Sequence, residues 1–247
     1  MFIPSQVHHT HCRHDCDSQV ADTFDLLCWN VHKKNRTHPA FADYISDTFG
    51  GAPDFLLLQE AQLDREQGCV LAGYAMEAAA NLQIGERYYG VVTAGKYAAS
   101  EAKAFLSEER EAYWGTHKSL LLSKYRFADG SDLLLVNIHA INFREQGAYC
   151  HEKERLYRFL SDYRGALIVA GDFNTWNSAR FEKLLSVSES LGLLRVPYEE
   201  KVKEMFGLPL DLVFYRGLTL EGYRADDGHG ISDHHPLYAR FSKKLYF

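Results

Sequence analysis

The chain has no apolar run long enough to cross a bilayer, which takes about 20 residues. Residues 1–6 contain neither a basic region nor an apolar core, so the sequence predicts no secretory signal peptide. We therefore expect a cytoplasmic protein without a transmembrane segment.

A surplus of positive charge is also missing. Lys and Arg number 27 against 33 Asp and Glu, which gives a formal net charge of −6. A protein that binds long nucleic acid mainly through phosphate contacts is usually more basic than this. The balance argues against tight nonspecific DNA binding. It does not exclude a nuclease, because an acidic metal site carries negative charge that a bound cation offsets.

Proline is scarce, with 6 residues, and no Gly/Ser/Pro-rich linker, repeat or low-complexity tract divides the chain. A length of 247 residues with 46% hydrophobic side chains suits one large α/β domain. We expect residues 24–247 to form a single catalytic domain, which works as a monomer, and residues 1–23 to form a flexible tail.

Cysteine is scarce as well. Five cysteines are an odd number for a disulfide framework and suit a reducing compartment. The predicted tail gathers residues of the types that bind zinc or copper, namely His8, His9, His11, Cys12, His14 and Cys16. Their spacing matches no closed zinc finger, so a flexible polar tail is the favoured interpretation.

What the chain does contain is apolar strands that end in polar residues. Residues 167–170 are apolar and lead through Gly171 into Asp172-Phe173-Asn174. Residues two apart on an extended segment project to the same side, so the carboxylate and the amide should lie side by side at the mouth of the core. The alternative is a turn in which both side chains bind backbone groups.

The same arrangement recurs along the chain. Apolar segments precede Asn30, Gln59-Glu60, Asn137 with His139 and Asn142, Asp211, and the segment Ser232-Asp233-His234. Open sheets place functional sites at strand ends, because the strands hold the adjoining loops rigid. Hairpins mixed with helical crossovers predict two mixed sheets packed face to face, with helices outside.

The ordered motifs W-N, L-Q-E, N-x-H, G-D-F-N, L-D-x-V and S-D-H-x-P resemble the endonuclease/exonuclease/phosphatase superfamily over about residues 25–242. The segments 137–143 and 210–217 are similar to an uncharacterised bacterial branch with N-I-H-A-[VI]-N-F and L-D-x-V-F-Y-R-G. The resemblance implies an α/β (α+β) fold, a four-layer αββα sandwich. It also implies a hydrolase of phosphoric ester bonds that needs Mg²⁺ or Mn²⁺.

Glu60 is the predicted principal metal ligand. An uncompensated carboxylate at the end of an apolar strand would be costly, and a hard divalent cation relieves that cost. The alternative is a solvated residue that opens the next helix. By resemblance, Asn30 supports the metal and contacts the phosphate, and Asn142 donates to the phosphate.

The predicted catalytic residues are Asp172, Asn174, His139, His234 and Asp211. Asp172 would polarise or deprotonate the attacking water, and Asn174 would hold that water or the scissile phosphate. His139 and His234 would relay a proton or donate to a phosphoryl oxygen. Asp211 would orient His234 and raise its pKa, and Asp233 would complete the metal or water environment. Each histidine alone could instead be a satisfied core or surface residue.

His32 and Lys118 are predicted to face the substrate. His32 stands where DNA-directed members of the superfamily often carry Asp or Arg, so what it selects is open. Lys118 precedes the apolar residues 120–122. The rest of the segment 95–117 is rich in glutamate and favours a solvated loop or helix.

The leading hypothesis is a metal-dependent phosphodiesterase, a nuclease (endonuclease or exonuclease) that hydrolyses DNA or RNA by in-line attack of water. A sphingomyelinase-like phospholipid or inositol-phosphate phosphoesterase comes second, because no amphipathic basic helix or exposed apolar hairpin is evident. A non-catalytic binding module on the same fold comes third, since no acid, amide or imidazole position is missing.

Overall fold

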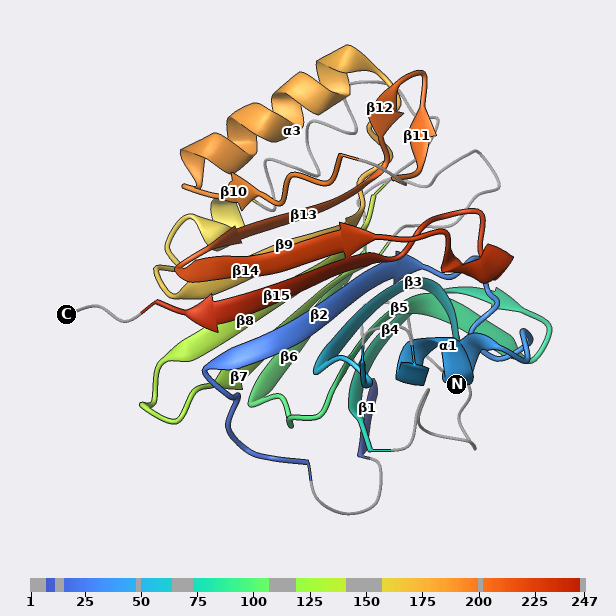
Figure 1. The fold of residues 1–247 in the computed structure, drawn as a ribbon, viewed down its shortest axis with the longest axis horizontal. Helices are drawn as coiled ribbons and strands as arrows, with labels where there is room; N and C mark the ends of the chain where they lie inside the picture. Colours follow the sequence, from blue (N-terminus) through green and yellow to red (C-terminus); the bar gives the residue numbers. More distant parts are fainter. Residues whose placement is uncertain are drawn as a thin grey trace.

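The structure is a computed structural model that describes residues 8–11, 16–47, 50–63, 73–106, 119–140, 157–199 and 202–244. Two large mixed β-sheets form its centre (Figure 1). The first has the order β1-β4-β5-β3-β2-β15-β14, with β1 (His8–His11), β2 (Thr23–Asn30), β3 (Phe55–Leu63), β4 (Ala75–Ile84), β5 (Arg87–Gly95), β14 (Leu218–Ala225) and β15 (Leu237–Lys243). The second has the order β10-β13-β9-β8-β7-β6, with β6 (Glu101–Leu106), β7 (Ser119–Arg126), β8 (Asp132–His139), β9 (Ala166–Asp172), β10 (Leu194–Arg195) and β13 (Asp211–Arg216).

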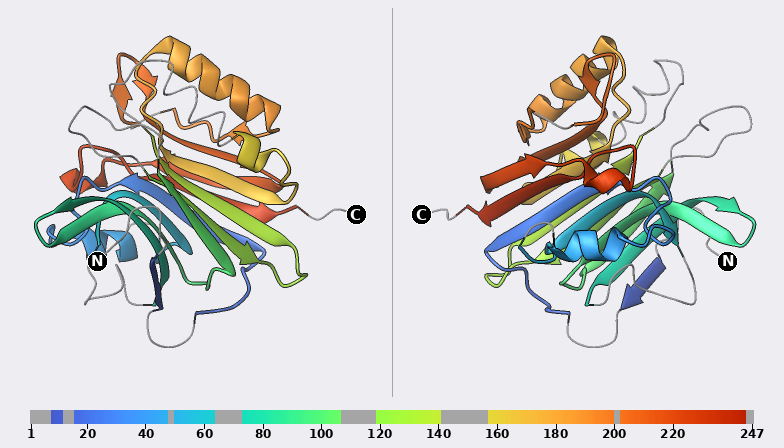
Figure 2. Two further views of the ribbon diagram at one scale, coloured as in Figure 1. Left: turned by 180° about the vertical axis from the view of Figure 1, so that it is seen from behind. Right: turned by 45° about the vertical axis from the view of Figure 1, so that its right-hand side comes forward.

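Helices cover the two outer faces. Helix α1 (Phe41–Asp47) packs Phe41, Tyr44 and Ile45 against the first sheet. Helix α3 (Ser178–Ser190) packs Leu184 against the second sheet. Figure 2 shows the blue α1 and the orange α3 on opposite sides of the sheets. The predicted four-layer αββα sandwich is therefore confirmed. Two small elements complete the fold, a hairpin of β11 (Glu204–Met205) and β12 (Leu208–Pro209) and a 3-10 turn, η1 (Gly228–Gly230).

The core between the sheets is aromatic. Phe24 packs edge-on against Phe55, with 5.5 Å between ring centroids, and Phe55 packs against Tyr125 at 4.8 Å. Tyr125 comes from the second sheet, so these contacts join the two sheets. Alternation along the strands explains this packing, because every second side chain of a strand points to the same face.

Each sheet contains one parallel pair of strands near its middle. Strands β2 and β3 are parallel, with Asn30 beside Gln59, and β8 and β9 are parallel, with His139 beside Asp172. Parallel strands end at the same edge of a sheet. The two pairs therefore deliver the polar residues of four strand ends to one end of the sandwich.

Two buried amides join the sheets just below that end. Gln59 Nε2 donates to Asn137 Oδ1 at 2.7 Å, and Asn137 Nδ2 donates to the carbonyl of Val92 at 2.8 Å. Gln59 and Asn137 are each 0% exposed. Asn137 of the N-x-H motif thus serves the connection between the sheets, while His139 reaches the strand ends.

The predicted flexible tail, residues 1–23, is packed in part of its described region. Strand β1 pairs with β4, and Val20 is 2% exposed in the core between the sheets. The packing therefore starts before the predicted boundary at residue 24. Cys16 and Cys28, the cysteines of the described residues, are free thiols.

Two local expectations differ from the structure. Strand β6 lies within the segment 95–117, where we expected a loop or helix. Strand β3 continues through Glu60 to Leu63, so the alternative interpretation of Glu60 as the residue that opens a helix is wrong, and the register of β3 shifts between Leu58 and Ala61. In the described part of the chain, no helix has the length and apolar character needed to span a bilayer.

Candidate functional site

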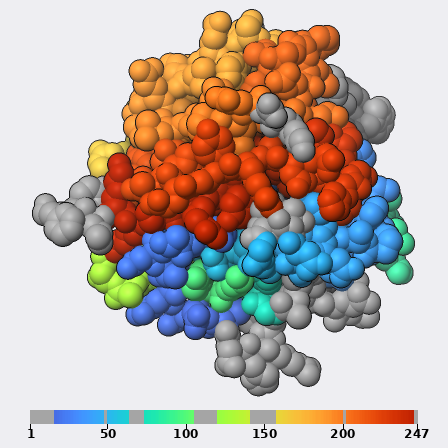
Figure 3. Space-filling view, in the orientation of Figure 1, coloured from blue at the N-terminus to red at the C-terminus, as the bar shows by residue number. Residues whose placement is uncertain are grey.

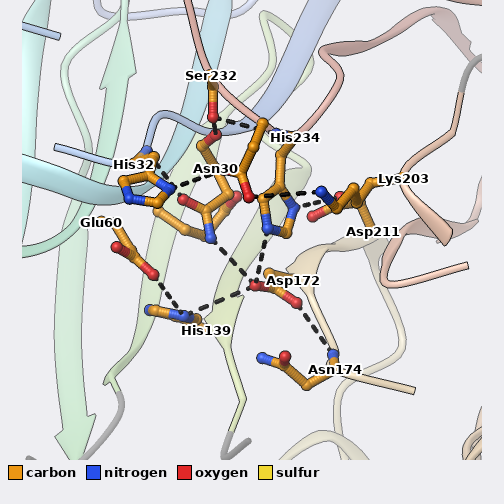
Figure 4. Close-up of polar contacts among 12 residues, drawn as sticks. Asn30, His32, Glu60, His139, Asp172, Asn174, Lys203, Asp211, Ser232 and His234 are labelled. Carbon is orange, nitrogen blue, oxygen red and sulfur yellow. Dashed lines mark hydrogen bonds and ion pairs between the residues drawn. The ribbon is translucent and has the colours of Figure 1, made fainter. Parts of the chain in front are cut away.

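Asp172 lies at the centre of the site, at the end of β9 (Figure 4). Its Oδ2 accepts a hydrogen bond from Asn30 Nδ2 at 3.1 Å and lies 3.7 Å from His139 Nε2 and 4.0 Å from His234 Nε2. Gly171 lets β9 reach this position, because its φ is +146° and a Cβ there would lie 1.9 Å from the carbonyl oxygen of Ile138.

The carboxylate of Asp172 is buried, at 3% exposure. Burial and the neighbouring charge of Asp211 raise its pKa to about 7, although His234 and the hydrogen bond from Asn30 act in the opposite direction. A carboxylate with a pKa near neutrality can accept a proton during a reaction at pH 7.

His234 and Asp211 form a buried ion pair beside Asp172. His234 Nδ1 lies 2.7 Å from Asp211 Oδ2. Burial on its own would lower the pKa of His234, but the Asp211 carboxylate outweighs it and raises the pKa to about 10. The imidazole is therefore a charged donor at neutral pH.

The first strand of the core holds the His234 segment in place. Trp29 Nε1 donates to the carbonyl of His234 at 2.8 Å, and Ser232 Oγ donates to the carbonyl of Asn30 at 2.7 Å. The W-N and S-D-H motifs, far apart in the sequence, thus form one unit.

Glu60 approaches from β3 on the other side of His139. Its Oε1 lies 3.6 Å from His139 Nε2, and its Oε2 forms an ion pair with Lys33 Nζ at 2.6 Å. Glu60 has a φ of +50°, and His32 and Lys33 have φ values of +42° and +64°. The left-handed backbone is unfavourable for these residues, so strand β3 at Glu60 and the loop after β2 are both held in an unusual shape at the site.

Asn174 reaches the site through a turn. Its φ is +49°, its N–H donates to Asp172 Oδ1 at 3.0 Å, and its Nδ2 donates to the carbonyl of Ala140 at 3.1 Å. The extended geometry from which we placed Asp172 and Asn174 side by side is therefore wrong. Arg180 of α3, 1% exposed, supports this turn by donating to the Asn174 carbonyl at 3.4 Å.

The exposed rim of the site alternates in charge. Asp233 accepts from His32 Nδ1 at 2.7 Å and lies 3.4 Å from Lys203 Nζ. Partial burial would raise the pKa of Asp233, but the hydrogen bond from His32 and the nearby positive charges lower it. The rim can therefore offer a carboxylate, an imidazole and an ammonium group to a ligand.

The carboxylate oxygens of the site fit a divalent cation. Asp172, Asp211 and His234 bring ligand atoms within 4.8 Å of one another. A protonated imidazole has no lone pair for a metal, however, and the pairing with Asp211 keeps His234 protonated. Glu60 already attracts the Lys33 ammonium, and the buried Oδ1 of Asp211 has no hydrogen-bond partner in the described parts of the chain. Carboxylate oxygens of this kind suit Mg²⁺ or Mn²⁺.

The structure thus brings nine predicted site residues together at one end of the sandwich: Asn30, His32, Glu60, His139, Asp172, Asn174, Asp211, Asp233 and His234. The remaining two, Lys118 and Asn142, lie outside the described residues.

Sequence reasoning missed Lys33 and Lys203. Lys33 is adjacent to His32, so its position in the loop after a predicted strand end was a usable signal. Lys203 lies in an irregular segment, and its pairing with Asp233 comes only from the tertiary fold.

A model of the Endonuclease/Exonuclease/phosphatase family matches residues 27–234. A UPF0294 protein of Vibrio cholerae serotype O1 is 35% identical over 239 residues, which cover 93% of this chain and 83% of that protein.

Solved structures show the same fold at low sequence identity. The endonuclease domain of TRAS1, a telomere-specific non-LTR retrotransposon, aligns with a TM-score of 0.60 and 17% identity over 90% of this chain and 100% of that chain. ANGEL2, a 2′,3′-cyclic phosphatase, aligns with a TM-score of 0.64 and 14% identity over 90% of this chain and 96% of that chain.

Proposed function

Because the chain belongs to the endonuclease/exonuclease/phosphatase family, we propose that it is a divalent-metal-dependent phosphodiesterase that hydrolyses nucleic acid. The observation that carries the proposal is the environment of Asp172. An amide and two imidazoles surround this buried carboxylate, and the Glu60 carboxylate lies on the far side of one imidazole. These groups can accept a proton from water and donate to phosphoryl oxygens during an in-line attack of water on phosphorus.

Asp172 takes the proton of the attacking water, since its pKa of about 7 matches that task. As the water oxygen bonds to phosphorus, the bond from phosphorus to the leaving oxygen breaks, and that oxygen takes a proton from solvent. The turn at Asn174 fixes the Asp172 carboxylate, because the Asn174 N–H holds the oxygen that Asn30 does not bind. His234, charged through Asp211, donates to a phosphoryl oxygen that gains negative charge in the transition state.

Glu60, with Asn30 and Asp233, holds the metal in this proposal. The bound cation supplies positive charge that stabilises the phosphoryl oxygens. Lys33 neutralises Glu60 in the present structure and would compete with a cation for that carboxylate.

Nucleic acid is the proposed substrate class for two reasons. The rim carries His32, Lys33 and Lys203, which suit a substrate with more than one phosphate. The TRAS1 endonuclease domain and ANGEL2, which share the fold, are named for cleavage of nucleic acid and of a cyclic phosphate.

The test is hydrolysis of single-stranded DNA, RNA, plasmid DNA, sphingomyelin, inositol phosphates and bis(p-nitrophenyl) phosphate, with Mg²⁺ or Mn²⁺ and with excess EDTA. We expect cleavage of nucleic acid that EDTA abolishes and added metal restores. Full turnover in EDTA after dialysis would exclude a metal requirement. Cleavage of sphingomyelin alone would exclude nucleic acid as the substrate.

Asp172→Asn is the matched variant for this test. We expect kcat to fall by about a hundred-fold or more, because the proton acceptor is lost while size and hydrogen bonding are kept. Removing one of two neighbouring buried carboxylates also relieves repulsion with Asp211, so we expect Tm not to fall. Asp43→Asn, on the exposed side of α1, is the control that should keep wild-type activity. A near-normal rate for Asp172→Asn would show that Asp172 acts only as a structural residue of the turn.

A further inference from the structure

The β11–β12 hairpin has an unusual residue at its tip. Met205 pairs with Leu208, so Phe206 and Gly207 form a two-residue turn, and their φ values are +54° and +76°. Two positive φ values define a type I′ turn, for which Asn-Gly is the favoured sequence. Phe206 instead places a large side chain on a left-handed backbone, which costs about 1–2 kcal/mol.

Burial of the Phe206 ring offsets little of that cost. Phe206 is 84% exposed, the highest exposure among the large hydrophobic side chains of the described residues. The space-filling view shows the orange segment that contains the hairpin on the surface, at the upper right of the molecule (Figure 3). Strain and exposure both oppose stability, so Phe206 points to a contact made outside the folded chain.

The hairpin is attached directly to the site. Lys203, which precedes β11, lies 3.4 Å from Asp233 through its Nζ, and its carbonyl accepts from the N–H of Leu210 at 2.9 Å. Thr175, which follows Asn174, donates its hydroxyl to the carbonyl of Pro209 in β12. Asp211 begins β13 two residues after the hairpin. The base of the hairpin is therefore held beside the elements that carry Asp172 and His234.

We propose that Phe206 stacks against an unpaired base of single-stranded nucleic acid whose neighbouring phosphate occupies the site. Three residues of extended chain span about 10 Å, so the ring lies within reach of a nucleotide next to one held at Lys203. An exposed aromatic ring beside a cationic group is the arrangement by which proteins bind single strands, with one base stacked and one phosphate paired. The inference rests on the proposed function and specifies its substrate as single-stranded.

A lipid surface is the competing partner for an exposed apolar tip. Binding to a membrane surface grows with the apolar area that enters it and with basic charge around it. The hairpin offers one ring that is 84% exposed, and the exposed Glu204 stands beside it. Stacking needs only one face of one ring, so the observations favour a base.

The decisive variant is Phe206→Asn, because it separates stability from binding. It restores the favoured Asn-Gly turn, so we expect Tm to rise. At the same time it removes the ring, so we expect the Kd for a fluorescein-labelled oligo(dT), measured by anisotropy in EDTA, to rise about ten-fold. Phe206→Trp should bind the oligonucleotide within about two-fold of wild type, since the indole also stacks.

Leu194→Asn is the matched control. Leu194 is 56% exposed and pairs with Tyr215, toward the end of β13 opposite to Asp211. It should leave oligonucleotide binding unchanged. An unchanged Kd for Phe206→Asn would overturn the inference. So would loss of binding to phosphatidylglycerol vesicles together with normal oligonucleotide binding, which would assign the tip to a membrane.

The two proposals fail in distinguishable ways. Binding in EDTA needs no turnover, so it tests the stacking contact even in a protein that cleaves nothing. Hydrolysis of bis(p-nitrophenyl) phosphate tests the phosphodiesterase itself. For an active enzyme, the ratio of kcat/KM for oligo(dT) to that for bis(p-nitrophenyl) phosphate should fall in Phe206→Asn and stay constant in Leu194→Asn.

Discussion

Glu77 on β4 is a single residue that makes the stability of the molecule depend on pH. It is 2% exposed, and burial raises its pKa from 4.5 to about 8. Between these two values the folded state keeps a proton that the unfolded chain has already lost. The stabilising effect is complete below pH 4.5 and is lost as pH rises toward 8, a change of about 4–5 kcal/mol.

We therefore expect Glu77→Gln to unfold at higher urea than wild type at pH 8 and to show a smaller loss of stability between pH 5 and pH 8. The neutral amide has no proton to lose. Glu182→Gln, on the exposed side of α3, should follow wild type at both pH values. Parallel pH profiles for Glu77→Gln and wild type would contradict the raised pKa.

His234 and Asp211 act as one unit at the residue scale. Each variant, Asp211→Asn or His234→Gln, removes the same 2.7 Å interaction, so the double variant should lose little more kcat than the worse single one. In protein stripped of metal, NMR should find the imidazole titrating near 10 in wild type and lower in Asp211→Asn. Additive losses of kcat, together with an unchanged imidazole pKa in Asp211→Asn, would contradict the coupling of His234 and Asp211.

At the scale of elements, the buried amides of β3 and β8 hold the two sheets in register. Asn137→Leu would remove the buried hydrogen bonds that Asn137 makes with the Gln59 amide and the Val92 carbonyl, at a cost of about 2–3 kcal/mol in the free energy of unfolding. The double variant Asn137→Leu/Gln59→Leu should lose less stability than the sum of the two single variants, because both variants remove the same Gln59–Asn137 hydrogen bond. Urea unfolding measures the stability of the single and double variants, and Gln83→Leu, at an exposed position, is the control. A strictly additive double variant would show that the amides act independently.

Elements with a clear apolar pattern were predictable from the sequence, and their irregular ends were not. The strands ending at Asn30, His139 and Asp172 follow from apolar runs, and the site followed from the residues at their ends. The left-handed conformation of Glu60 and Asn174 was not predictable, because tertiary contacts override the intrinsic preference of both residues. Strand β6 was missed because its alternating charged residues lie on an exposed edge strand.

At the scale of the whole molecule, Val20 tests where the packed domain begins. It is 2% exposed, and its N–H donates to the carbonyl of Arg126 at 2.8 Å. Val20→Ala should lower the free energy of unfolding by about 2 kcal/mol through the cavity it leaves. Gln19→Ala, at an exposed neighbouring position, should have no effect. Equal stability of the two variants would support a domain that starts at the predicted residue 24.

The place of β15 in the first sheet has a consequence for synthesis on the ribosome. β15 lies between β14 and β2, and Trp29 holds the His234 carbonyl across 205 residues of sequence. At about 5–20 residues per second, roughly 10–40 s separate the emergence of the two partners. During that time the edge of β2 that pairs with β15 has no partner strand, because β15 has not yet been synthesised. A chain that ends before residue 234 therefore lacks both β15 and the Trp29–His234 contact, and the edge of β2 beside β15 stays uncovered.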